Sequence, residues 1–260
     1  MCHPNNREMV VDVIHAITGI SKKLLRNANY IGGEEIPKRN LEQKKQQMDM
    51  TIKINANHQI IVEMNQFWTK TLFDKNIEYT FARIVENTRR NTKKYPKIIL
   101  INIDNFNHFH TNKPIMEFKI RDEDGVIESE IFKSIHLILA NFQDSSYNVD
   151  NEIKKFVSFL KKTTIEELEQ EFKGDEKYMA ATRTVKDLSL DPEFSGYYDL
   201  EEAHKEELED MRITALEEGM EQNKIETAKN LLTMSVLSIE QISKATNLSI
   251  EEINKIKEEL

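Results

Sequence analysis

The stretch that most constrains the fold runs from Met48 to Gln66 and reads MDMTIKINANHQIIVEMNQ. It contains two runs in which apolar and polar residues alternate, joined by an Asn-rich segment, and this pattern is typical of a β-hairpin. A register that pairs Asp49 with Asn65 sets every apolar residue of one run opposite an apolar residue of the other. The apolar pairs predicted in this way are Ile54 with Ile60, Ile52 with Val62, and Met50 with Met64.

Two carboxylates fall on the polar face of this predicted hairpin. In the register above, Glu63 is diagonal to Asp49, and diagonal neighbours lie about 7–8 Å apart, a gap that one divalent cation can bridge. The alternative is a solvated outer face, which suits Thr51 and Lys53, and spacing alone favours it. Against it, Glu63 lies in the run IIVEM, which is apolar on both faces. Such a strand is typically covered on both sides, where a carboxylate needs a partner or a metal.

The composition limits the classes of protein that the chain can belong to. Its 260 residues suffice for one large domain or for two to three small ones, and only 7 Gly and 5 Pro suggest that helix dominates. The net charge of −9 means that a nucleic-acid binder must concentrate its positive charge locally. The single cysteine, Cys2, excludes an intramolecular disulfide and a cysteine-rich zinc site.

The sequence also predicts where the protein resides. It contains no apolar run long enough to span a bilayer, and no signal peptide precedes the first predicted helix. One cysteine fits a reducing compartment. We therefore expect a cytoplasmic protein with no membrane partner.

Around the hairpin, the hydrophobic pattern predicts helices and strands up to about residue 145. Gly32-Gly33 and Pro37 predict a loop before the hairpin. In the helix that follows the hairpin, the residues expected to face inward are Ile77, Phe81, Ile84 and Val85. The predicted helices are 5–20 and 73–91, and the predicted strands are 97–106, 114–120 and 127–139.

The far end of the helix predicted over residues 73–91 carries the densest basic patch in the chain. The patch includes Arg83, Arg89 and Arg90, followed by three lysines. Positive charge at a helix C-terminus is stabilised by the helix macrodipole, which gives a purely structural explanation. The functional alternative is that these arginines contact DNA.

From Val149 onward the pattern is helical only. Residues 197–222 are strongly acidic and would repel DNA. Near the end, a short helix is predicted over residues 228–234, and two further helices open with capping boxes at Ser238 and Ser249. Asn247 between them fits a left-handed C-terminal cap, which gives a helix-turn-helix outline. Because the last helix is acidic, we expect this tail to pack or to make a homo-oligomer rather than to read bases.

With these stretches identified, the chain resembles the PD-(D/E)XK nuclease family transposases, also called Rpn-type recombination-promoting nucleases. The segments that carry the resemblance are MDMTIKINANHQIIVEMN, FDKNIEYTFARIV, PKIILINIDNFNHFH and TAKNLLTMSVLSIEQISKATNLSIEEI. The first and last are the more specific. The resemblance implies a restriction-endonuclease-like α/β core, with a mixed central sheet flanked by helices and followed by an all-helical C-terminal region. The expected division is a nuclease domain over 1–145, an acidic helical connection over 146–218 and a small helical tail over 219–260.

The resemblance also implies an active site. Asp49 and Glu63 would hold Mg²⁺, with Mn²⁺ as a substitute and the backbone carbonyl of Met64 as a third ligand. Asn65 would occupy the position of the family's Lys or Gln, which orients the attacking water. The residues expected to contact DNA are Lys70, Lys75 and Arg83, together with Arg89 and Arg90 of the basic patch.

These observations predict a metal-dependent DNA endonuclease associated with recombination or mobile elements. The alternative is a catalytically impaired member of the same fold that acts as a DNA-binding or oligomeric assembly protein. The acidic pair is intact, whereas Asn65 is shorter than the Gln of the family pattern, so both functions stay open.

Overall fold

The computed structural model describes residues 2–36, 46–55, 57–87, 95–143, 147–190 and 200–258. The chain divides into two compact units, residues 1–197 and residues 198–260, and each is described by itself. The helices between residues 151 and 189 pack within the first unit. The three-part division expected from the sequence stays a prediction.

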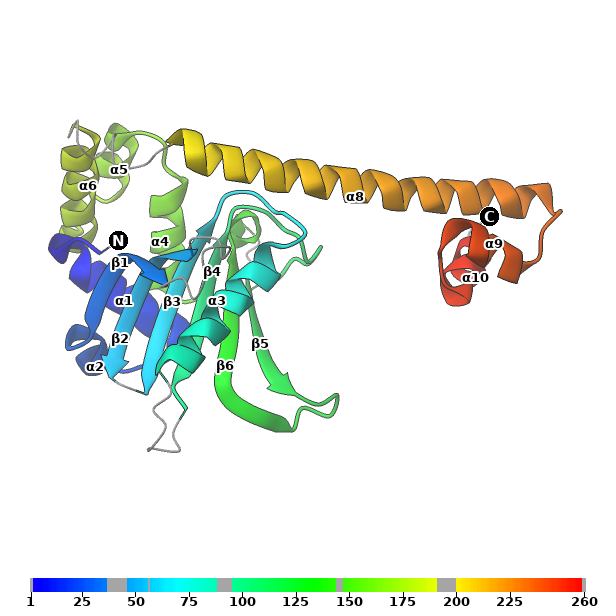
Figure 1. The fold of residues 1–260 in the computed structure, drawn as a ribbon. Helices are drawn as coiled ribbons and strands as arrows, with labels where there is room; N and C mark the ends of the chain where they lie inside the picture. Colours follow the sequence, from blue (N-terminus) through cyan, green and yellow to red (C-terminus); the bar gives the residue numbers. More distant parts are fainter. Residues whose placement is uncertain are drawn as a thin grey trace. The chain divides into compact units, whose positions relative to one another are not determined.

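A six-stranded mixed sheet forms the centre of the first unit (Figure 1). The strand order is β1-β2-β3-β4-β6-β5. Strands β3, β4 and β6 run parallel to one another, and the remaining neighbours are antiparallel. The sheet and its flanking helices confirm the α/β fold class. The strands are β1 (Asn29–Ile36), β2 (Gln46–Asn55), β3 (His58–Asn65), β4 (Lys97–Asp104), β5 (Ile115–Arg121) and β6 (Ile127–Ile138).

Strand β1 replaces the loop that the sequence predicted before the hairpin. It pairs with β2 antiparallel, and Gly32 lies opposite Met50. A Cβ at Gly32 would lie 3.1 Å from the Cys2 sulfur, so this glycine permits a close approach within a strand. The prediction of a loop was therefore wrong for Gly32-Gly33, which lie within a strand, whereas Pro37 lies outside the described residues.

The hairpin of β2 and β3 is present, but its predicted register was wrong by two residues. Met50 pairs with Val62 and Ile52 pairs with Ile60. Because side chains alternate with a period of two, a two-residue shift leaves every side chain on its predicted face. Continuing the observed register by one step places Asp49 directly opposite Glu63 rather than diagonal to it.

One face of the sheet packs against helices from both ends of the first unit. Helices α1 (Arg7–Thr18), α4 (Asn151–Lys161) and α6 (Glu176–Ser189) share its large apolar core, with α2 (Lys22–Arg26) and α5 (Ile165–Glu171) beside them (Figure 1). The buried carboxylate of Asp12 forms ion pairs with Lys22, at 2.6 Å, and with Lys177. This shared carboxylate connects α1 to α6.

The opposite face of the sheet packs against α3 (Leu72–Asn87), which crosses it in Figure 1. Ile84 is buried there as predicted, but Phe81 is 39% exposed and Val85 58% exposed. Those two inward assignments were wrong. The buried side of α3 is largely polar, with Asn76, Thr80 and Arg83 among its residues.

The second unit contains α8 (Leu200–Met234), α9 (Ile239–Thr246) and α10 (Ile250–Glu258), whose small core includes Ala228, Ile242 and Ile253. The capping boxes at Ser238 and Ser249 are confirmed, and Asn247 adopts a φ of 60° as expected for a left-handed cap. The separate helix predicted over 228–234 is wrong, because α8 continues without interruption for 35 residues. Among the described residues, no helix combines the length and apolarity needed to cross a bilayer.

Candidate active site

Asp49 on β2 and the end of β3 are joined by a direct hydrogen bond. The backbone N–H of Met64 donates to Oδ2 of Asp49 at 2.7 Å. This bond holds the Asp49 carboxylate against the backbone of Met64, the residue that follows Glu63 in the chain. The structure thereby brings together Asp49, Glu63 and Met64, the three residues expected to hold a cation.

Glu63 lies in surroundings that disfavour its charge. Its Oε1 is buried and accepts no hydrogen bond from the described residues. Burial, followed by the nearby negative charge of Asp49, raises the pKa of Glu63 to about 8, although the Asp49 backbone N–H and Lys75 act in the opposite direction. Without a cation beside it, Glu63 therefore carries a proton at neutral pH.

Asp49 is exposed as a residue, yet the partial burial of its carboxyl group raises the pKa of that group. The hydrogen bond from Met64 acts in the opposite direction. Burial thus raises the pKa values of both carboxylates. Two ionised carboxylates at one point of a sheet repel each other, so both can be charged there only if a positive charge lies between them.

The donor set suits a hard divalent cation. Mg²⁺ binds oxygen ligands and keeps several waters, so two carboxylates and a backbone carbonyl are sufficient protein ligands. The lone pairs of Glu63 Oε1 have no other partner among the described residues, which is what a ligand position requires. No cluster of three or more His, Cys, Asp or Glu side chains suited to a metal occurs in the described part of the chain.

Asn65, expected to orient the attacking water, is buried at 7% exposure. Its amide nitrogen donates to Oδ1 of Asp104 at 2.7 Å and to Oδ1 of Asn102 at 3.3 Å. Its amide oxygen accepts from the Asn76 amide nitrogen at 3.4 Å. The structure thus connects this side chain to β4 and α3.

A buried polar network continues from Asn65 across the sheet. Nδ1 of His136 lies 2.8 Å from Oδ2 of Asp104, and since a carboxylate only accepts, Nδ1 carries the hydrogen. Nε2 of His136 then accepts from the amide nitrogen of Asn102 at 3.3 Å. Asn76 donates to Oδ1 of Asn102 at 3.0 Å, which links the network to α3.

The sequence analysis missed the network residues Asn76, Asn102, Asp104 and His136. A signal was present in β4, where Asn102 and Asp104 interrupt the apolar run KIILINID at alternate positions. Residues two apart in a strand share a face, so this spacing places both at the buried polar site. His136 carried no comparable signal, because only the pairing of β4 with β6 brings it opposite Asn102.

The basic residues expected to contact DNA have different environments. Lys70 is exposed in the turn before α3, and Lys75 is half-buried and close enough to Glu63 to lower its pKa. Arg83 is only 3% exposed, so its guanidinium offers no surface to a phosphate in this conformation. Arg89 and Arg90 lie outside the described residues.

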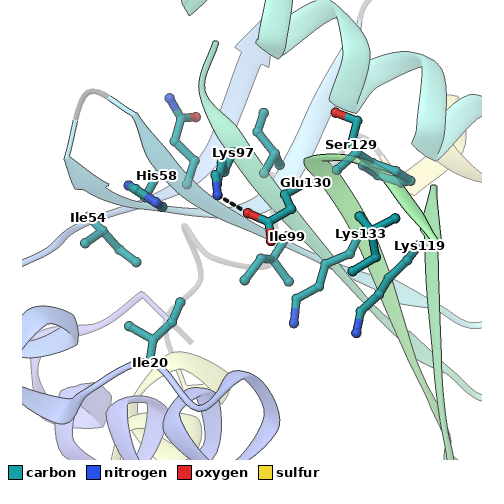
Figure 2. Close-up of a pocket in the computed structure, with 13 residues that line it drawn as sticks. Ile20, Ile54, His58, Lys97, Ile99, Lys119, Ser129, Glu130 and Lys133 are labelled. Carbon is teal, nitrogen blue, oxygen red and sulfur yellow. Dashed lines mark hydrogen bonds and ion pairs between the residues drawn. The ribbon is translucent and has the colours of Figure 1, made fainter. Parts of the chain in front are cut away.

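A pocket of about 330 Å³ lies at the other end of the sheet (Figure 2). It is lined by residues near the beginnings of β3 and β4, including His58, Lys97 and Ile99. Lys97 is ion-paired with Glu130 across its rim. The pocket contains none of the residues predicted for the active site, which lie where β3 ends.

Comparison with known proteins identifies one family. A family model described as "PD-(D/E)XK nuclease family transposase" matches residues 1–214. No curated protein and no solved structure matches the chain.

Proposed function

Because the chain belongs to the PD-(D/E)XK nuclease family transposases, we propose that it is a metal-dependent endonuclease that hydrolyses DNA phosphodiester bonds during recombination or the movement of mobile elements. One observation carries this proposal. Oε1 of Glu63 is buried without a hydrogen-bond partner among the described residues, and burial, followed by the charge of Asp49, raises the pKa of this carboxyl group. That arrangement is unfavourable for an empty pair of carboxylates and favourable for a cation.

Asp49, Glu63 and the Met64 carbonyl would hold Mg²⁺ or Mn²⁺. The bound cation would polarise the scissile phosphate and lower the pKa of a coordinated water. The Met64 N–H aims the Asp49 carboxylate, since it occupies Oδ2 at 2.7 Å. Glu63 must lose its proton to become a ligand, so cation binding releases a proton below about pH 8.

Lys70 and Lys75 are the proposed phosphate contacts. Both lie between the end of β3 and the first turns of α3, close in sequence to the acidic pair. Each lysine supplies local positive charge in a chain whose net charge is −9. The burial of Arg83 does not support a similar role for that residue.

We assign Asn65 a positioning role. Its amide nitrogen already donates to Asp104 and Asn102, so its two N–H groups are used inside the protein. These bonds hold the end of β3 against β4 and thereby fix the backbone of Met64. The same observation favours a second candidate function, a DNA-binding or assembly protein of low catalytic rate, because no free amide remains to orient water.

Cleavage of supercoiled plasmid in Mg²⁺ or Mn²⁺ tests the main proposal. The wild type should nick the plasmid, whereas Asp49→Ala and Glu63→Gln should be inactive. Asp74→Ala is the matched control, since Asp74 is an exposed carboxylate on the first turn of α3. Equal cleavage by wild type and Asp49→Ala would refute the assignment. Inactive wild-type protein that still binds DNA would favour the second function.

We also propose that the protein is cytoplasmic and forms homo-oligomers through its second unit. Ile213, Leu216 and Met220 recur on α8 at intervals of three and four, and their exposed fractions are 43%, 65% and 58%. Exposed apolar residues at this spacing are typical of a helix seam that pairs with another helix.

A further inference from the structure

Two loops with an unusual composition follow the ends of β3 and β4. They span residues 66–71 and 105–113, and neither contains an Asp or a Glu, although the chain has 45 acidic residues. Both contain a lysine, Lys70 and Lys113. The rings in these loops form what we term the aromatic rim: Phe67, Trp68, Phe106, His108, Phe109 and His110.

The topology brings the two loops to one end of the sheet. Strands β3 and β4 are parallel, with Asn65 opposite Asp104. The loops that follow the two strands therefore leave the sheet side by side (Figure 1). Across the loops, the Asn105 amide nitrogen donates to Oε1 of Gln66 at 3.2 Å. Trp68 stacks on His108 with ring centroids 4.4 Å apart and an interplanar angle of 12°. The aromatic rim is therefore one surface built from two loops.

The longer loop is held in place by hydrogen bonds to its own backbone. Asn107 donates to the carbonyl of Thr111 at 2.8 Å, and Asn141 donates to the same carbonyl at 2.7 Å. Phe109 stacks on Phe73 of α3 at 5.3 Å. A platform fixed in this way loses little conformational entropy when a flat ligand stacks on it.

Among the phenylalanine and tryptophan side chains of the rim, Phe67 is the most available to a ligand, because it is 55% exposed whereas Trp68, Phe106 and Phe109 are half-buried. It follows Glu63 by four residues, and four residues of extended chain span at most about 14 Å. That reach corresponds to about four nucleotide steps along a strand, at about 3.4 Å per step. A strand bound at the acidic pair that runs toward this loop would therefore come within reach of the Phe67 ring.

From these observations we propose that the aromatic rim stacks on unpaired nucleobases, so the preferred substrate of this site is DNA with a single-stranded or extrahelical stretch beside the cleaved bond. This proposal rests on the proposed nuclease function. Stacking on an exposed ring requires a base whose face is free, and a paired base inside a duplex has both faces covered. The net charge of −9 favours the same substrate, because a single strand carries half the axial charge density of a duplex.

Binding of oligonucleotides in EDTA, which prevents cleavage, tests the proposal. A DNA strand that carries 2-aminopurine is used in three forms. It is single-stranded in the first, part of a duplex with the 2-aminopurine extrahelical in the second, and part of a fully paired duplex in the third. The wild type should bind the first two more tightly and quench their fluorescence. Phe67→Ala should weaken that binding about tenfold or more and abolish the quenching, and should leave weak binding to paired DNA unchanged.

Three further variants separate stacking from other effects. Phe67→Trp should retain the quenching, whereas Phe67→Leu, which is apolar but not aromatic, should lose it. Tyr95→Ala is the matched control, since Tyr95 is 60% exposed and precedes β4 at the opposite end of the sheet. Binding by Phe67→Ala that equals the wild type, or equal affinity for paired and unpaired DNA, would overturn the proposal.

The experiments distinguish a failure of the aromatic rim proposal from a failure of the nuclease proposal. Plasmid cleavage that depends on Asp49 but is accompanied by no base quenching would refute the aromatic rim alone. Quenching that depends on Phe67 in a protein that cleaves nothing would refute the nuclease assignment alone.

Discussion

The backbone N–H of Met64 donates to Oδ2 of Asp49 over 2.7 Å, so a carboxylate on β2 is aimed by the strand that carries Glu63. The two halves of the acidic pair are thereby coupled through the backbone as well as through their charges. Any change that shifts β3 along its axis moves both groups.

Glu63 should make the protein less stable as the pH rises. Its folded pKa of about 8 lies above the ordinary value of 4.5, so the folded state binds more protons between these values. The contribution of Glu63 to the free energy of unfolding is therefore most favourable below about pH 4.5 and becomes less favourable as the pH approaches 8. Relative to Glu63→Gln, the wild type should lose on the order of 2–4 kcal/mol between pH 5 and pH 8.5. Urea denaturation of both proteins measures this difference, and a constant difference across the range would contradict it.

Mg²⁺ should stabilise the wild type and do so more at pH 8 than at pH 6. Binding must displace the Glu63 proton, which alkaline conditions remove in advance. At a concentration 100 times Kd the gain is about 2.7 kcal/mol, visible as a rise in melting temperature. Asp49→Asn should abolish the rise and Asp74→Asn should keep it. A rise in Asp49→Asn equal to that of the wild type would place the cation elsewhere.

Asn65→Asp should destabilise the fold by roughly 2–4 kcal/mol at neutral pH. The substitution replaces an amide nitrogen, 2.7 Å from Oδ1 of Asp104, by a carboxylate oxygen. Gln66→Glu is the matched control, since Gln66 is exposed and adjacent in the chain. Chemical denaturation compares the two. The penalty should shrink at low pH, where the new carboxylate is protonated, and a penalty that is no larger than that of Gln66→Glu would show that the network does not hold β3.

Leu216→Glu should shift the protein toward monomers. Leu216 is 65% exposed in the middle of the apolar stripe on α8, and a charge there opposes helix pairing. Light scattering after size-exclusion chromatography measures the mass. Val126→Glu is the control, because Val126 is 66% exposed in the loop between β5 and β6. An unchanged oligomeric state in Leu216→Glu would remove α8 from the interface.

The sequence alone predicted the hairpin, the central strand β4 and the sharing of one face by Asp49 and Glu63. It did not predict the register, because a shift of two residues preserves the alternation on which the argument depended. The register is set near the turn, where Asn55 pairs with His58 and a β-bulge follows Lys53. Such details depend on backbone geometry rather than on hydrophobic pattern.

The buried network could be predicted only in part. Asn102 and Asp104 are recognisable as polar residues at alternate positions of an apolar strand. Their partners Asn76 and His136 come from α3 and β6, and only the tertiary arrangement brings them together. The role expected for Asn65 came from its place in the family pattern, and burial in this network gives it different partners.

The ion pairs of Asp12 have a consequence for how the chain folds as it is made. Asp12 lies on α1, and its partner Lys177 on α6 is separated from it by 165 positions. The apolar core likewise joins Val10 of α1 to Ala181 of α6. This face of the sheet is therefore fully covered only after α6, which ends at Ser189, has been synthesised. Until then the apolar side chains that pack against α6 lack their cover, and exposed apolar surface makes incomplete chains prone to aggregation.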